Sequence, residues 1–116
     1  MTSINLIEIP EIELAPGYMS RLVHSESMTI SNVHAKAHSP LPEHFHPQEQ
    51  VVNVIDGIIE LTMDGTKHVL GPGSVLVIPP NAPHSAYTQT DCHIIDVFHP
   101  ARKTFKTLPP TRSATS

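Results

Sequence analysis

The chain has 116 residues, which is enough for one domain and too few for two of typical size. Seven lysines and arginines against eleven aspartates and glutamates give a net charge of −4, and no segment is strongly basic. We therefore expect no nucleic-acid partner and no anionic-membrane partner. Charged residues make up 16% of the chain, below the roughly 25% usual for soluble domains, which favours a subunit interface over part of the surface.

Three residue types set further limits, because the chain holds twelve prolines, nine histidines and one cysteine. Proline at this density disfavours long helices, since each proline removes an amide donor and crowds the preceding turn. The single cysteine, Cys92, excludes an intrachain disulfide and a multi-cysteine zinc site. If the chain binds a metal, histidine has to carry it.

The first fourteen residues have no basic run and no continuous apolar stretch, because Glu8, Glu11 and Glu13 interrupt the pattern. A secretory signal is therefore not predicted. No apolar run approaches the ~20 residues of a membrane span. We expect a cytoplasmic, reduced protein.

From residue 28 onwards, short apolar or alternating segments are separated by turn residues every eight to twelve positions, a pattern typical of β-sandwiches and barrels. Strands are predicted over 28–31, 33–37, 51–55, 58–63, 67–70, 74–78, 86–90 and 93–98. Asp56-Gly57 predicts a hairpin between two of them, and Asp64-Gly65 predicts another. No helix longer than a single turn is predicted, and the Pro/Ser/Thr-rich tail 107–116 is predicted to be disordered.

The segment from Pro40 to Gly57 reads PLPEHFHPQEQVVNVIDG. On a strand, His44 and His46 point to the same face because they are two residues apart, and Gln50 keeps that parity. Two imidazoles and an amide oxygen on one inward face are able to hold a divalent metal. A further ligand has to come from elsewhere, and His84, at a proline-rich strand end, is the candidate.

These residues resemble the two motifs of the cupin superfamily, as His44-x-His46-x3-Gln50-x6-Gly57 and Gly73-x5-Pro79-x-Asn81-x2-His84. The resemblance implies an all-β fold, the double-stranded β-helix (jelly-roll, RmlC-like) barrel, over residues 31–106. Residues 1–30 would supply strands that complete the barrel or a dimer interface. The resemblance also implies one divalent metal inside the barrel, bound by His44, His46, Gln50 and His84.

Three positions depart from the cupin pattern. His38 and Asn81 stand where the motifs have glycine, and we interpret both as tolerated turn changes. Gln50 stands where most cupins have glutamate. A neutral ligand leaves the full dipositive charge on the site, which favours Lewis-acid chemistry and anion binding over redox iron. The ligand set does not distinguish among Ni, Zn, Mn, Fe and Cu.

A narrower resemblance involves the segment DVFHPAR, which with HxHPxxQ and IPPNAPH is similar to the KdgF-type cupins. Those proteins open the ring of 4,5-unsaturated uronic acid monomers in bacterial pectin and alginate breakdown. The resemblance implies a small anionic sugar acid as substrate, the linear 4-deoxy-5-keto-uronate as product, and a homodimer. It also implies pocket or catalytic roles for Asp96, Phe98 and Arg102. From the residues alone, Asp96 and Phe98 share one strand face, and Arg102 offers a planar fork to a carboxylate.

Several alternatives stay open on the sequence alone. Asp96 could pair with Arg102 as a structural ion pair, Phe98 could be plain core, and Arg102 could be solvated. A solvated strand face is favoured over a cationic pocket for three alternating residues, namely His34, Lys36 and His38. The alternative functions are a non-catalytic cupin that binds or senses a small anionic ligand, and another cupin enzyme, either a sugar isomerase or epimerase or an oxygenase.

Overall fold

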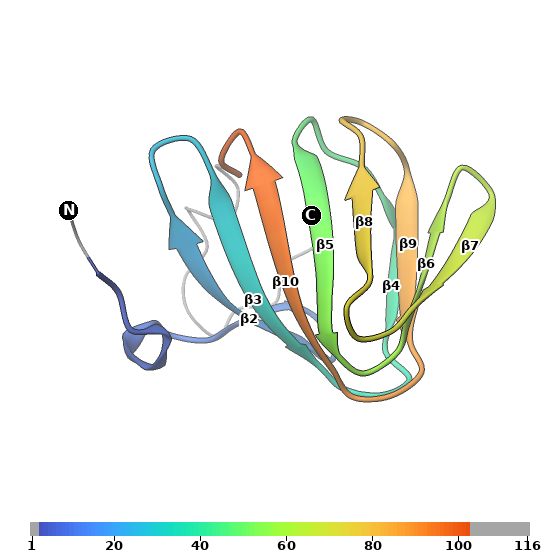
Figure 1. Cartoon of the computed structure of the whole chain (residues 1–116), viewed down its shortest axis with the longest axis horizontal. Helices are drawn as coiled ribbons and strands as arrows, with labels where there is room; N and C mark the ends of the chain where they lie inside the picture. The colour runs from blue at the N-terminus through green and yellow to red at the C-terminus, as the bar shows by residue number, and fades with distance from the viewer. Residues whose placement is uncertain (1–2, 103–116) are drawn as a thin grey trace.

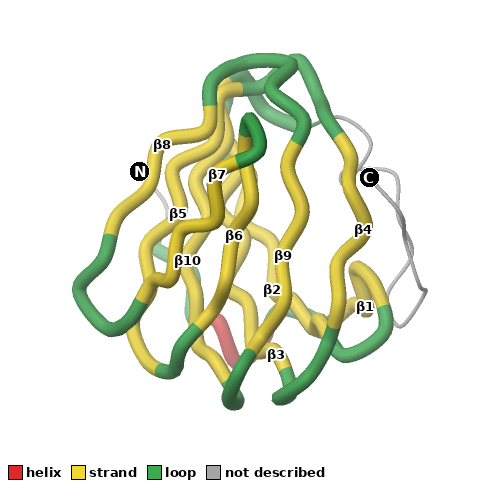
Figure 2. The backbone as a smooth tube through the Cα atoms, turned by 90° about the vertical axis from the view of Figure 1, so that its right-hand side faces the viewer, coloured by secondary structure: helices red, strands yellow, loops and turns green. Residues whose placement is uncertain are grey.

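The computed structural model describes residues 3–102, so the predicted disordered tail lies outside the described residues. Its strands form two antiparallel sheets that face each other (Figures 1 and 2). The six-stranded sheet has the order β1 (Ile12–Ala15), β2 (Tyr18–His24), β3 (Thr29–Ala35), β10 (Cys92–His99), β5 (Glu49–Asp56) and β8 (Val75–Ile78). The four-stranded sheet has the order β4 (Pro40–His44), β9 (His84–Thr88), β6 (Ile59–Met63) and β7 (Thr66–Leu70).

Alternation along the strands separates an inner face from an outer face, as β3 illustrates. Thr29, Ser31, Val33 and Ala35 are buried, whereas the residues between them are half-buried or exposed. This period of two is what a sheet with one covered face requires. The core between the sheets is made of such inward residues from both sheets, among them Val33, Val52 and Leu61. The predicted all-β class is confirmed.

The predicted hairpin at Asp56-Gly57 is wrong. β5 pairs with β10 and β8, whereas β6 pairs with β9 and β7, so the chain crosses from one sheet to the other at this turn. Gly57 has a φ of +88°, and a Cβ there would lie 2.1 Å from the carbonyl oxygen of Asp91. The prediction failed because an Asp-Gly turn has the same local chemistry whether the next strand returns to its own sheet or joins the facing one.

The second predicted hairpin, at Asp64-Gly65, is confirmed, because Met63 and Thr66 are register partners in the β6–β7 pair. The N-terminal strands β1 and β2 join the six-stranded sheet beside β3. Within residues 3–102 the helical structure is a single 3-10 turn, η1 (Leu6–Glu8), and no helix is long and apolar enough to cross a membrane.

Candidate metal centre and ligand cavity

Three histidines meet at one end of the barrel. His44 ends β4 and His84 begins β9, and the two are register partners across the four-stranded sheet. His46 lies in the β4–β5 loop, where its carbonyl accepts a 2.8 Å hydrogen bond from the backbone N–H of Asn81 in the β8–β9 loop. Figure 1 shows both loops at the upper end of the barrel. The two motif segments are therefore tied together by main-chain contact.

Gln50 reaches this cluster by a different route from the one predicted. Strand parity predicts His44, His46 and Gln50 on one strand, but the chain leaves β4 at His44 and enters β5 at Glu49. Gln50 thus belongs to the facing, six-stranded sheet. The turn between the strands, and not strand parity, brings Oε1 of Gln50 to 3.1 Å from Nε2 of His46.

Each imidazole is oriented by a backbone carbonyl two residues away. The three hydrogen bonds run from Nδ1 of His44 to Pro42 (2.9 Å), from Nδ1 of His46 to Gln48 (3.0 Å) and from Nδ1 of His84 to Ala82 (2.8 Å). A carbonyl only accepts, so each Nδ1 carries the proton and each Nε2 presents a lone pair. One nitrogen from each ring lies within 4.8 Å of the other two, so three lone pairs converge.

The converging atoms lack suitable partners among the described residues. Nε2 of His84 is buried there without a hydrogen bond. With the proton on Nδ1, Nε2 of His46 and Oε1 of Gln50 are both hydrogen-bond acceptors, and neither donates to the other. With the proton on Nε2 instead, Nδ1 would be an acceptor facing the carbonyl oxygen of Gln48, which is also an acceptor. A divalent cation resolves both problems, because it takes lone pairs from nitrogen and oxygen alike. The donor set therefore fits a metal ion.

Burial keeps the three rings neutral, which is the form that binds a metal. Burial, and after it the electrostatic effects of Arg102 and His84, lower the pKa of His46 to about 4. Burial is also the main reason that the pKa values of His44 and His84 lie below 6.5.

Asp96, on β10, lines the cavity next to this cluster. Burial raises the pKa of Asp96 to about 7, while a hydrogen bond with Gln50 and the charge of Arg102 oppose the rise. Because an amide donates through nitrogen, that bond leaves Oε1 of Gln50 free to face His46. Oδ1 of Asp96 has no hydrogen-bond partner among the described residues.

Arg102 is a buried cation of the cavity wall and not a solvated arginine. Its Cζ lies 4.9 Å from the centroid of the Phe98 ring. Phe98 in turn contacts His46 edge-on, with ring centroids 5.5 Å apart, so its ring contacts both the guanidinium and an imidazole of the cluster. Burial lowers the pKa of Arg102 to about 10, and Asp96 opposes this, so Arg102 stays charged at neutral pH.

The cavity between the sheets measures about 70 Å³, room for several water molecules and hence for a small ligand. Most of its wall is aliphatic, with side chains such as Val33, Val52 and Leu61. Its polar groups belong to the residues already described together with Tyr18, whose hydroxyl donates to the carbonyl of Ser39 at 2.8 Å. The cavity therefore combines a dry aliphatic wall with one cation, one carboxyl group and the imidazole cluster.

Comparison with known proteins identifies the family. A family model described as the cupin domain matches residues 31–98. The chain belongs to the cupin family. No curated protein matches it in sequence.

Solved structures share the fold over 76–90% of this chain. KdgF from Halomonas sp. is 24% identical with a TM-score of 0.83, covering 90% of this chain and 98% of that one. An RmlC-like cupin from Shewanella frigidimarina is 23% identical with a TM-score of 0.84, covering 90% and 96%. A mutant of salicylate 1,2-dioxygenase from Pseudoaminobacter salicylatoxidans is 17% identical with a TM-score of 0.72, covering 76% and 28%. The predicted jelly-roll barrel is thereby confirmed.

Two departures from the cupin motifs have a common backbone explanation. His38 and Asn81 have φ values of 61° and 63°, the left-handed region that favours glycine. Asparagine is among the residues that enter this region most readily. The turns of the motifs are therefore retained although their glycines are not.

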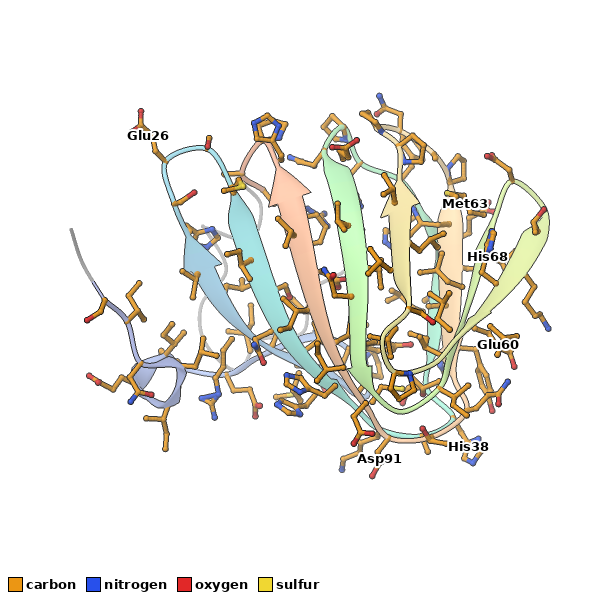
Figure 3. The ribbon with its side chains drawn as sticks, in the orientation of Figure 1. Glu26, His38, Glu60, Met63, His68 and Asp91 are labelled. Carbon is orange, nitrogen blue, oxygen red and sulfur yellow. The ribbon has the colours of Figure 1, made fainter. Side chains whose placement is uncertain are left out.

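The three alternating polar residues for which a solvated strand face is favoured, His34, Lys36 and His38, are exposed. Figure 3 shows His38 at the lower end of the barrel, opposite the histidine cluster, where its Nδ1 lies 3.0 Å from the Tyr87 hydroxyl. His34 is exposed and stacks on His93, with ring centroids 4.4 Å apart. Lys36 is exposed as well, so the structure agrees with a solvated face for this set.

Thr29 contributes to the site without any signal in the sequence motifs. It is fully buried, and its Oγ1 accepts a 3.0 Å hydrogen bond from the backbone N–H of Arg102. It is also the register partner of Phe98 across the β3–β10 pair. Only the pairing of these distant strands reveals that Thr29 holds the segment carrying Arg102.

Proposed function

We propose that this cupin is a metal-dependent enzyme that opens the ring of 4,5-unsaturated uronic acid monomers to the linear 4-deoxy-5-keto-uronate. The observation that carries the proposal is the cavity itself. One small space is lined by a buried arginine, a buried carboxyl group, a glutamine and two neutral histidines, and the third clustered histidine, His46, lies beside them. The structural likeness to KdgF and the motif resemblance around Asp96, Phe98 and Arg102 support it.

His44, His46, His84 and Gln50 are the residues that would hold the metal. Bound there with four neutral ligands, a divalent metal supplies Lewis acidity toward oxygen atoms of the substrate. The protein's own part is to keep the four donor atoms oriented, through the three backbone carbonyls and the hydrogen bond between Gln50 and Asp96.

Arg102 is proposed to bind the substrate carboxylate. Its guanidinium presents paired N–H donors that match a carboxylate, and burial strengthens such a contact. The guanidinium lies over the ring of Phe98, which gives it a second contact inside the cavity. The aliphatic wall excludes water and suits the unsaturated ring, which has lost one hydroxyl group to the double bond.

Asp96 is proposed to move the proton. In the reaction the C1–O5 bond breaks, the C1 hydroxyl loses a proton and becomes the aldehyde, and C4 gains a proton as the enol at C5 becomes a ketone. The product is an isomer of the substrate, so no further reactant is needed. Asp96 lines the cavity with one oxygen free among the described residues, and a positioned acid or base contributes about 10²–10⁴-fold in rate.

The test follows the ultraviolet absorbance of the enol ether in a freshly released unsaturated uronate. Metal-loaded protein is expected to accelerate its loss, and Asp96→Asn is expected to slow turnover by about 10²-fold or more with metal content unchanged. Asp91→Asn makes the same change at the opposite end of the barrel (Figure 3) and is expected to keep full activity. His84→Ala is expected to lose the metal, whereas His68→Ala, on β7, is expected to retain it.

Three results would overturn the proposal. The first is no acceleration by metal-loaded protein. The second is calorimetric binding of the uronate without turnover, which would favour the non-catalytic alternative. The third is oxygen consumption coupled to substrate loss, which would favour an oxygenase.

A further inference from the structure

Two histidines lie side by side on the outward face of the six-stranded sheet, outside the site described above. His34, near the end of β3, and His93, near the start of β10, are register partners, and Figure 1 shows these two strands next to each other. Their rings stack with centroids 4.4 Å apart and planes 11° from parallel. His34 is exposed and His93 is half-buried, so ions in solvent have access to the pair.

The pair is separate from the cavity. On either side of His93 in β10, Cys92 and Ile94 point into the core, so the His93 side chain points away from it. Phe98, which lines the cavity, lies five residues further along the same strand, a distance of about 17 Å. A ligand of the pair therefore does not contact the residues of the proposed reaction.

A hydrogen bond fixes the ring of His93 and its tautomer. Nε2 of His93 lies 3.0 Å from Oδ1 of Asn32. Because an amide oxygen only accepts, Nε2 carries the proton and Nδ1 presents a lone pair. Histidines that bind metals have this arrangement, in which the second ring nitrogen donates to an acceptor that orients the ring.

The ring of His34 is able to move toward that lone pair. Within residues 3–102 it stacks on His93 and makes no hydrogen bond, so nothing opposes a turn about its Cβ–Cγ bond. Two nitrogens that bind one metal ion at 2.0–2.1 Å lie about 3 Å apart. Directly opposite residues on antiparallel strands have Cβ atoms about 4.5–5.5 Å apart, from which imidazoles reach this spacing when one ring tilts out of the stack.

The charges beside the pair favour a cation. Asp56, on β5, is the register partner of His93 on the side away from His34, and it is exposed. Burial and His34 lower the pKa of His93, whereas the negative charge of Asp56 opposes them. Lys36, two residues beyond His34, is exposed as well, and its flexible stem allows the ammonium group to move away from an ion.

We infer that His34 and His93 form a second metal site, which holds one divalent transition-metal ion on the outer face of the sheet with water completing its coordination. This inference goes beyond the proposed reaction and does not depend on it. Imidazole nitrogen suits copper, nickel and zinc, and copper(II) binds such ligands most tightly. Two protein ligands, against four in the cavity, make the outer site the weaker one.

The experiment uses copper(II) as the probe and His84→Ala as the background, since that variant is expected to empty the cavity site. Isothermal titration calorimetry is expected to find two copper ions per wild-type chain and one in His84→Ala. Adding His34→Ala weakens the remaining site by more than about tenfold, and adding Asn32→Leu weakens it about tenfold because Asn32 orients His93. Adding His38→Asn removes another exposed imidazole, keeps a residue suited to the left-handed turn, and leaves the affinity unchanged.

Electron paramagnetic resonance gives a second measurement. Copper in His84→Ala is expected to show coupling to two ring nitrogens, which is lost when His34→Ala is added. Magnesium, which prefers oxygen ligands, is expected not to compete for the site. Circular dichroism of each variant establishes that it is folded, and His44→Ala provides an independent background with the cavity site removed.

Two results would overturn the inference. One is a folded His84→Ala variant that binds no copper. The other is copper binding that His34→Ala leaves unchanged, which is the result expected if the ion is held by the chain terminus or by other surface histidines.

Discussion

At the scale of single residues, Arg102 is held at two points, by Phe98 of its own motif segment and by Thr29, which no motif contains. Its guanidinium stacks over Phe98, and its backbone N–H donates to the buried hydroxyl of Thr29. The same hydroxyl lies 2.9 Å from Nδ1 of His24. The hydroxyl is therefore a fixed anchor for the segment that follows β10.

Thr29→Val tests this positioning role. The substitution keeps the shape of the side chain but leaves the buried N–H of Arg102 without its acceptor, a loss of about 1–3 kcal/mol. We expect the KM for the uronate to rise on the order of fivefold while kcat changes less than about twofold, because Thr29 acts through Arg102. Thr29→Ser keeps the hydroxyl and is expected to restore KM. A fall in kcat with unchanged KM would contradict the assignment.

At the scale of elements, the crossing from β5 to β6 depends on a glycine for reasons of space. Gly57 and Gly65 both have positive φ, +88° and +74°, but only Gly57 has a neighbour where a Cβ would stand. Gly65 closes a hairpin in open space. The two glycines thus separate the cost of backbone strain from the cost of a clash.

We expect Gly65→Ala to destabilise the protein by about 1–2 kcal/mol, the cost of a left-handed conformation for an L-residue. Gly57→Ala carries the same cost and an additional 1–3 kcal/mol, by an order-of-magnitude estimate, because the added carbon overlaps the backbone of Asp91. Urea unfolding followed by circular dichroism measures both. Equal losses of unfolding free energy in the two variants would show that the β5–β6 turn accommodates the added carbon without further cost.

At the scale of the whole molecule, the shifted pKa values of the site residues make the free energy of unfolding depend on pH. In the metal-free protein, the pKa values of the three clustered histidines lie below their unfolded values near 6.5, with His46 at about 4. As pH falls below about 6.5, the unfolded chain binds protons that the native histidines do not, so stability falls. Asp96, with its pKa raised to about 7, acts in the opposite direction between pH 7 and 4.

Asp96→Asn removes the opposing contribution, so we expect the metal-free variant to lose stability as pH falls from 6.5 to 4, and to lose more than the wild type does. Thermal unfolding in the presence of a chelator, at several pH values, provides the measurement. Stability that is constant or increases as pH falls through this window would contradict the expectation.

The sequence by itself was sufficient for whatever depends on local chemistry. Alternating residues indicated strands, the spacing around His44, His46 and His84 indicated the cupin motifs, and Asp64-Gly65 indicated its hairpin. Even the replaced glycines at His38 and Asn81 were interpretable, because a turn conformation is a property of one residue.

Only the tertiary structure decided which strands are neighbours, because pairing joins residues far apart in the chain. It placed β5 and β6 in different sheets, brought Gln50 to His46 across a turn, and joined Thr29 to the segment of Arg102. It also aligned one aliphatic residue from each of five neighbouring strands, which no local pattern reveals; these are Val23, Ile30, Val97, Val51 and Val77. The burial that keeps the histidines neutral and Arg102 inside the cavity arises from the same long-range pairing.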